Sequence, residues 1–227
     1  MNFINGIIKY NHNKIKQHRM TLYQNKYRAE SNRWQFWNYS APASYFITVC
    51  VQNKKYILGE IENHKMKLSD AGIIVSDYFA EISKYHKRII LDEWIVMPNH
   101  FHCIIKLGDY DFDNGVSVIG NGNDGNVDKI HVDKIHEFYL PYNQTKPSEN
   151  DIKQYRKLRR KMLIPMIMGK FQMQTSKQIN IINITPENKN WQNNYHDHVI
   201  RNDTEYKRIK QYIKNNPLNW KDDKFYK

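Results

Sequence analysis

Apolar side chains form three short blocks along the chain, each the length of a β-strand. Residues 45–51 are aromatic or β-branched almost throughout, which predicts a strand buried on both faces of a sheet. Residues 91–97 and 100–107 are separated only by Pro98 and Asn99, which are turn residues. We therefore predict two adjacent antiparallel strands joined by a tight turn. Weaker strand signals follow the first block at 56–60 and 65–68, and an extended piece is expected at 195–201.

Helical spacing appears between these blocks. Ser69 and Asp70 precede a predicted helix over 71–87, whose apolar side chains share one side and should pack on the sheet. Those side chains are Ile74, Tyr78, Phe79 and Ile82.

Three further helices are predicted toward the carboxyl end. One covers 152–163, and Pro165 opens the next, which runs to about 179. The last covers 206–216, with Asn202 or Asp203 as its N-cap and a proline directly after it as its stop. The order of elements indicates an α+β fold, with a central antiparallel sheet and helices mainly on one face.

The chain of 227 residues fits one domain better than two. Residues 1–40 show no regular periodicity and are interpreted as a basic amino-terminal arm, which leaves 41–227 as the domain. Residues 108–150 are rich in Gly, Asn and Asp and contain a tandem five-residue repeat over 127–136. Such a stretch buries too little apolar surface to offset its ordering entropy, so we predict a surface insertion.

Composition favours a folded protein with an anionic partner. Hydrophobic residues make up 40% of the sequence, and the formal net charge is +12, which attracts nucleic acid. A generic basic protein from an AT-rich genome would show the same charge. The densest basic run falls on the predicted helix over 152–163, where it forms either a solvated face or a phosphate-binding surface, and we favour the latter.

The number of cysteines and the hydropathy of the chain bear on the cellular compartment in which the protein works. Cys50 and Cys103 both lie in apolar runs, so neither a disulfide framework nor a cysteine-rich zinc site is expected. No stretch approaches the roughly 18 apolar residues of a membrane span, and the opening residues are too polar for a secretory signal. We expect a bacterial cytoplasmic protein with no membrane partner.

A histidine pair stands at the start of the third apolar block. Because strand side chains alternate, His100 and His102 project from one face while Phe101 points to the other. Such pairs also arise by chance. The preceding strand and turn would hold the two rings rigidly, which favours metal ligation.

The final predicted helix carries a second pair of candidate functional residues, a tyrosine and an asparagine. Tyr212 and Asn216 are four residues apart and share a helix face. A phosphodiester resists attack unless a divalent cation offsets the charge of the transition state, and a phenol is a poor nucleophile unless positive charge stabilises its phenolate. A metal site and a nucleophilic tyrosine must therefore be neighbours, although a tyrosine in this setting could equally be a packing residue.

Taken together, these pieces resemble the single-tyrosine HUH transposases, and within them the REP-associated tyrosine transposase-like (insertion-sequence transposase) branch. The resemblance is carried, in the family's order, by residues 37–40 and 45–50, 58–61, 93–102, 169–171, 191–202 and 212–217.

The resemblance implies an RRM-like (ferredoxin-like) core, His100 and His102 as metal ligands, and Tyr212 as the nucleophile of a 5′-phosphotyrosine intermediate. It also suggests Asn216 as the third ligand, consistent with its helical spacing. Mg²⁺ is the expected metal, with Mn²⁺ as a substitute and no nucleotide cofactor. The expected partner is single-stranded or hairpin DNA, held by Arg156, Lys157, Arg159, Arg160, Lys161 and Lys170.

The sequence departs from the family pattern in two places. The insertion is not part of that pattern, and His196, Asp197 and His198 form a competing metal-like group that we interpret as structural. Three alternatives stay open beside the transposase: an HUH replication initiator or relaxase, a domesticated hairpin-binding protein that does not cut, and a metal hydrolase acting on another substrate. Both a monomer and a homodimer are compatible with the resemblance.

Overall fold

The computed structural model describes residues 36–108 and 148–226. Most of the predicted arm, and nearly all of the predicted insertion with its repeat, lie outside these ranges, so both stay predictions. Of the arm, residues 36–40 are described, and Tyr39 among them is 1% exposed and packed in the core.

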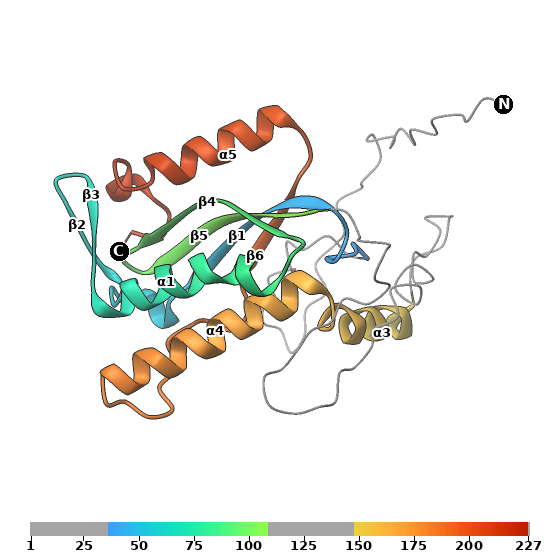
Figure 1. Cartoon of the computed structure of the whole chain (residues 1–227), viewed down its shortest axis with the longest axis horizontal. Helices are drawn as coiled ribbons and strands as arrows, with labels where there is room; N and C mark the ends of the chain where they lie inside the picture. Colours follow the sequence, from blue (N-terminus) through green and yellow to red (C-terminus); the bar gives the residue numbers. More distant parts are fainter. Residues whose placement is uncertain (1–35, 109–147, 227) are drawn as a thin grey trace, which may run out of the picture. The chain divides into compact units, whose positions relative to one another are not determined.

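A four-stranded sheet forms the centre of the fold (Figure 1). It consists of β1 (Ala43–Cys50), β4 (Ile89–Met97), β5 (His100–Leu107) and β6 (His196–Ile200), in the order β4-β5-β1-β6. Every neighbouring pair is antiparallel. With one helix after β1 and others after β5, this is the β-α-β-β-α-β order of a ferredoxin-like fold, which confirms the predicted fold class.

Helices cover the two faces of this sheet unequally. The helices α1 (Asp70–Tyr85) and α4 (Leu163–Ile182) lie together on one face, and α5 (Asp203–Asn215) lies on the other (Figure 1). A further helix, α3 (Glu149–Arg159), leads into α4. The weaker strand signals correspond to a separate two-stranded hairpin of β2 (Gly59–Glu62) and β3 (Lys65–Leu68). The first of these strands begins at Gly59 instead of at 56, and the Leu58 amide donates a hydrogen bond to the Pro98 carbonyl.

Most of the apolar core lies between the sheet and the α1/α4 layer. Phe101 of β5 packs against Phe79 of α1 and Phe171 of α4, with ring centroids 4.8 and 5.3 Å away. Burying each such ring stabilises the fold by roughly 1.5–3 kcal/mol. On the opposite face, the buried cluster under α5 consists of Ile104, Ile209 and Ile213. Partly buried side chains, among them Phe46, Ile95 and Ile200, surround this cluster, and a second small cluster contains Trp220 and Phe225.

The helix ends follow the predicted capping chemistry. The Ser69 side chain accepts a hydrogen bond from the Gly72 amide at the start of α1, and the Asn202 side chain accepts one from the Glu205 amide at the start of α5. Asn216 is the C-cap of α5, directly before Pro217. This end was expected, because proline has no backbone N–H group and cannot donate a helical hydrogen bond.

Cys50 and Cys103 are both buried free thiols, as predicted. Among the described residues, none of the helices has the length and apolar character needed to cross a bilayer.

Candidate functional site

The two histidines of β5 project toward α5. His100 and His102 are 0% and 1% exposed, and their ring centroids are 4.5 Å apart. Phe101 between them points into the core on the other face, as the alternation of a strand requires. The strand thus delivers two rigidly held imidazoles to the same small region.

Each imidazole is oriented by a hydrogen bond on its Nδ1 atom. His102 Nδ1 lies 2.8 Å from the Thr48 hydroxyl, which the register of β1 places directly opposite. His100 Nδ1 lies 2.9 Å from Oδ1 of Asn99, in the turn before β5. Partners on Nδ1 leave Nε2 as the ligand atom and hold the ring in place. The sequence pattern did not single out Thr48 or Asn99 for this role, although both stand at positions that the strand and the turn bring beside the rings.

The final helix brings Tyr212 and Asn216 to the same place. The Tyr212 hydroxyl is 3.3 Å from His102 Nε2, across 110 residues of sequence. The tyrosine residue as a whole is 38% exposed. Asn216 is 1% exposed and keeps helical geometry (φ −57°, ψ −41°) although it precedes a proline. The structure therefore places all four residues in one cluster within a single chain.

A carboxylate that sequence reasoning missed completes this cluster. Asp223 lies in the segment after α5, and its Oδ2 atom accepts hydrogen bonds from the Tyr212 hydroxyl at 3.0 Å and from Asn216 Nδ2 at 2.9 Å. Ligand atoms of His100, His102 and Asp223 all lie within 4.8 Å of one another. No periodicity marks Asp223, because it follows the last helix in an irregular segment.

The same segment covers the imidazoles with aromatic rings. Phe225 lies 4.4 Å from the His100 ring, centroid to centroid, and Trp220 lies 5.9 Å from it. The Asn99 side chain donates a 2.8 Å hydrogen bond to the Phe225 carbonyl and so ties the segment to the turn before β5. The amines of Lys54 and Lys224 lie 5.3 and 4.8 Å from the centroid of the Phe225 ring, which places two cations next to the site.

Burial decides the protonation states of the site. It lowers the pKa of His100 to about 4, against an opposing effect of Asp223. Burial also lowers the pKa of His102 well below its usual value, with a smaller contribution from His100. Both rings are therefore neutral at pH 7 and ready to act as ligands. Burial, and next the charge of Asp223, raise the pKa of the Tyr212 phenol, which keeps it protonated at neutral pH.

The donor set fits a divalent cation. His100 Nε2 and Asn216 Oδ1 are both buried and have no hydrogen-bond partner in the described part of the chain. Unpartnered buried polar atoms cost about 1–3 kcal/mol each, so their presence beside a carboxylate calls for a ligand. Two neutral imidazoles and one carboxylate are ligands of first-row divalent metals, and the donor atoms alone do not distinguish one metal from another.

The basic residues predicted to bind DNA lie elsewhere. They lie on α3, on the short link after it and on α4, and these helices join the core layer on the face opposite α5. Arg156, Lys157, Arg160, Lys161 and Lys170 are exposed, and Arg159 is half-buried. The structure therefore does not bring them into the cluster around Tyr212, and the cations next to that cluster are Lys54 and Lys224.

The competing histidine group is separated by strand geometry. In β6, His198 faces α5 and its Nε2 atom lies 2.8 Å from a carboxylate oxygen of Glu205. The neighbouring Asp197 points to the other face, where its charge and hydrogen bonding raise the pKa of the Tyr39 phenol after the larger effect of burial. Adjacent residues of a strand point to opposite faces, so Asp197 cannot join His196 and His198 around one ion, and the interpretation of this group as structural stays a prediction.

Comparisons with known proteins found a similar sequence and similar solved structures. No family model matches the chain. An uncharacterized protein of Haemophilus influenzae is 28% identical over 200 residues, covering 86% of this chain and 92% of its own length. A solved structure of a REP-associated tyrosine transposase bound to a REP hairpin is 15% identical, with a TM-score of 0.41, covering 85% of this chain and 74% of that one.

Proposed function

We propose that this chain is a DNA transposase of the single-tyrosine HUH class, which cuts and rejoins single-stranded DNA through Tyr212. The observation that carries the proposal is the 3.3 Å contact between the Tyr212 hydroxyl and His102 Nε2, beside Asp223. A nucleophile, two neutral imidazoles and a carboxylate in one cluster suit phosphoryl transfer, whereas a protein that only binds DNA needs none of them in this arrangement.

In the proposed reaction, the Tyr212 oxygen attacks a DNA phosphate and forms a phosphotyrosyl bond to the 5′ side. The bond from phosphorus to the 3′ oxygen breaks, and that oxygen takes a proton from solvent and leaves as a 3′-hydroxyl. The phenol proton passes to Asp223, which already accepts the hydrogen bond from this hydroxyl at 3.0 Å. Attack by another 3′-hydroxyl on the phosphotyrosine reverses these bond changes and joins the strands, with no nucleotide cofactor.

His100, His102 and Asp223 would hold the cation, Mg²⁺ or Mn²⁺, with Asn216 beside them. When bound, the cation offsets the charge that develops on the phosphate and on the phenolate. Thr48 and Asn99 orient the imidazoles for this task through their Nδ1 contacts. Because all these residues belong to one chain, we propose a site that acts in cis, whether or not a homodimer forms.

DNA binding by the basic helix α3 and Lys170 is part of the same proposal. Five of those six side chains are exposed and free to contact phosphates. Since they lie on the face opposite α5, the DNA would have to extend around an edge of the sheet to reach Tyr212. Lys54 and Lys224 are the cations placed to meet the strand at the site itself.

The proposal is tested by incubating an end-labelled single-stranded hairpin with Mn²⁺ and three proteins: wild type, Tyr212→Phe, and Tyr85→Phe. Tyr85 is a matched control because it is 75% exposed on α1. Wild type and Tyr85→Phe should give a covalent protein–DNA adduct on a denaturing gel and a free 3′-hydroxyl, and Tyr212→Phe should give neither. Chelation should stop the reaction, and Mn²⁺ should restore it.

Two results would overturn the proposal in different ways. Equal cutting by wild type and Tyr212→Phe would remove Tyr212 as the nucleophile. Hairpin binding by wild type without any adduct would favour the domesticated binding protein. Joining of the adduct to a second strand with a free 3′-hydroxyl separates a transposase reaction from simple hydrolysis.

A further inference from the structure

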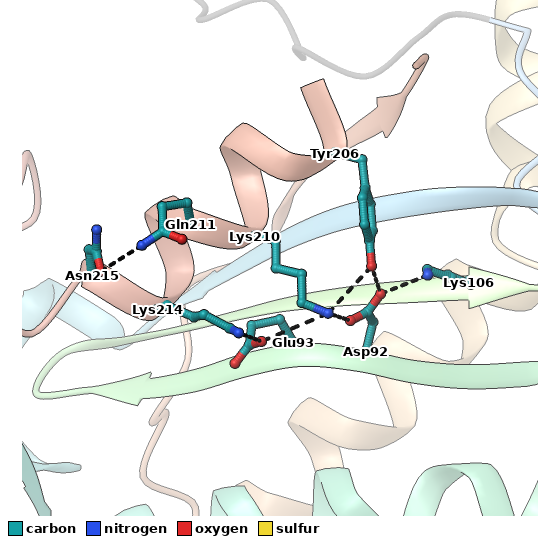
Figure 2. Close-up of polar contacts among 8 residues, drawn as sticks. All are labelled: Asp92, Glu93, Lys106, Tyr206, Lys210, Gln211, Lys214 and Asn215. Carbon is teal, nitrogen blue, oxygen red and sulfur yellow. Dashed lines mark hydrogen bonds and ion pairs between the residues drawn. The ribbon is translucent and has the colours of Figure 1, made fainter. Parts of the chain in front are cut away.

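The edge strand β4 contains a bulge beneath α5. Leu91 pairs with Ile105 and Trp94 pairs with Cys103, so two residues of β4, Asp92 and Glu93, stand opposite a single residue of β5. A bulge of this kind re-aims side chains and resets the alternation of the strand. Leu91 and Trp94 therefore both pack on the core face, while both carboxylates reach toward α5 (Figure 2).

These two acids contact a row of side chains on α5. The Asp92 carboxylate accepts hydrogen bonds from Tyr206 and from Lys210, whose amine is 2.5 Å away. Glu93 lies 3.4 Å from the amine of Lys214. Tyr206, Lys210 and Lys214 follow one another at intervals of four residues, so they form one stripe along the helix.

Lys106 of β5 completes the network from the sheet side. Its amine lies 2.8 Å from Asp92 and 4.5 Å from the centroid of the Tyr206 ring. The side chain of Asp92 is only 10% exposed, unlike that of an ordinary surface ion pair. Burial disfavours its charge, but the hydrogen bonds from Lys106, Lys210 and Tyr206 outweigh this and hold its pKa well below the usual range.

The apolar contact of α5 cannot by itself set the rotation of the helix. Only Ile209 and Ile213 are buried along its 13 residues, and they form a narrow seam against Ile104, edged by the partly buried side chains of Phe46, Ile95 and Ile200. At about 100° per residue, the stripe of Tyr206, Lys210 and Lys214 lies on one flank of this seam, and Tyr212 and Asn216 lie on the other. A roll of α5 about the seam would therefore move Tyr212 and break the acidic contacts together.

We propose that Asp92, presented by the bulge and supported by Glu93, is a positioning residue that sets the rotation of α5 and so holds the Tyr212 phenol against His102. The catalytic consequence of this positioning rests on the function proposed above. Asp92 itself touches none of the reacting groups. It acts through the helix that carries the nucleophile.

The size of the effect follows from the helix geometry. A roll of about 20° moves a side-chain atom about 6 Å from the helix axis by about 2 Å. Since a displacement of about 1 Å at a reacting group can slow a reaction about 100-fold, Asp92→Asn should lower the cleavage rate about 100-fold or more. Hairpin affinity should change less than about threefold, because Asp92 and its partners on α5 lie away from the proposed phosphate contacts.

The decisive measurement needs no DNA. The rings of Tyr212 and Phe46 both lie near His102, with centroids 5.3 Å from it in each case. Phe46 belongs to the sheet, so a nuclear Overhauser effect between Phe46 and His102 is an internal reference. In Asp92→Asn, the Tyr212–His102 signal should weaken while the Phe46–His102 signal keeps its intensity.

Gln211→Ala is the matched control on the same helix. Gln211 bonds only to Asn215 at 3.0 Å in the contacts drawn, on the side of α5 away from the acidic pair (Figure 2). It should change neither signal. In case Asp92→Asn fails to fold, Glu93→Lys and Lys214→Glu provide a second test: each alone should weaken the Tyr212–His102 signal, and the double variant should restore it.

Unchanged ring signals in Asp92→Asn would overturn the positioning role, and so would equal loss of both signals, which would show general loosening of the sheet. A failure of the wild type to cut DNA would instead remove the proposed function. The ring signals would still decide whether Asp92 holds Tyr212 in place.

Discussion

Replacing Thr48 with valine removes one hydroxyl and tests whether the sheet orients His102. Thr48 is 4% exposed, and its Oγ1 atom lies 2.8 Å from His102 Nδ1. Valine keeps the branched shape and the strand preference but offers no polar atom. The ring nitrogen is then buried without a partner, and nothing holds the tautomer that leaves Nε2 free for a ligand.

Two magnitudes follow from this geometry. Loss of a group that orients a metal-binding histidine lowers metal affinity about 10- to 100-fold, which corresponds to about 1.4–2.7 kcal/mol of binding free energy. The unsatisfied nitrogen lowers the free energy of unfolding by about 1–3 kcal/mol. We therefore expect Thr48→Val to fold, to be measurably less stable, and to bind Mn²⁺ at least tenfold more weakly than wild type.

Calorimetric titration with Mn²⁺ and urea unfolding in chelator measure the two effects separately. Thr175→Val is the matched control, because Thr175 is also buried and its hydroxyl donates to the Phe171 carbonyl and accepts from Trp191 Nε1, on the other side of the sheet. It should lose similar stability and keep wild-type Mn²⁺ affinity. Wild-type affinity in Thr48→Val, or equal affinity losses in both variants, would refute the orienting role of Thr48.

Three further outcomes are expected. Asp223→Ala should weaken Mn²⁺ binding by more than about 100-fold, the upper range for a group that only orients a ligand. Asn216→Ala should weaken it less. If calorimetry gave the reverse order, Asn216 would be the third ligand. In the presence of chelator, the free energy of unfolding should fall as the pH drops from about 6.5 to about 4. In that range the histidine of the unfolded chain binds a proton, whereas the buried His100, with its pKa of about 4, stays neutral in the folded chain. Urea titrations should show a loss on the order of 3 kcal/mol from His100, and the total loss should be smaller by that amount in His100→Gln, where the buried His102 still contributes. Neutralising Arg159 and Arg160 together should weaken hairpin binding and reduce its logarithmic salt dependence by about 1.4; an unchanged slope would place the DNA elsewhere.

Much of the fold could be predicted from local pattern. The strand, turn and strand around Pro98 and Asn99, the caps at Ser69 and Asn202, and the stop at Pro217 all depend on backbone conformations that near neighbours decide. The bulge was missed because residues 91–97 were interpreted as one regular strand. Two adjacent acids inside an apolar run were the available signal.

The candidate site also has features that the sequence alone predicts and features that only the tertiary structure shows. By itself, the sequence determined that His100 and His102 share a strand face and that Tyr212 and Asn216 share a helix face, because period-two and 3.6-residue spacings are properties of the backbone. Only the tertiary structure decided that these faces meet, that Asp223 joins them, and that Thr48, Asn99 and Asp92 hold them in position. Those contacts join residues that are distant in sequence or irregular in pattern. They depend on how the sheet and α5 pack, which no local spacing records.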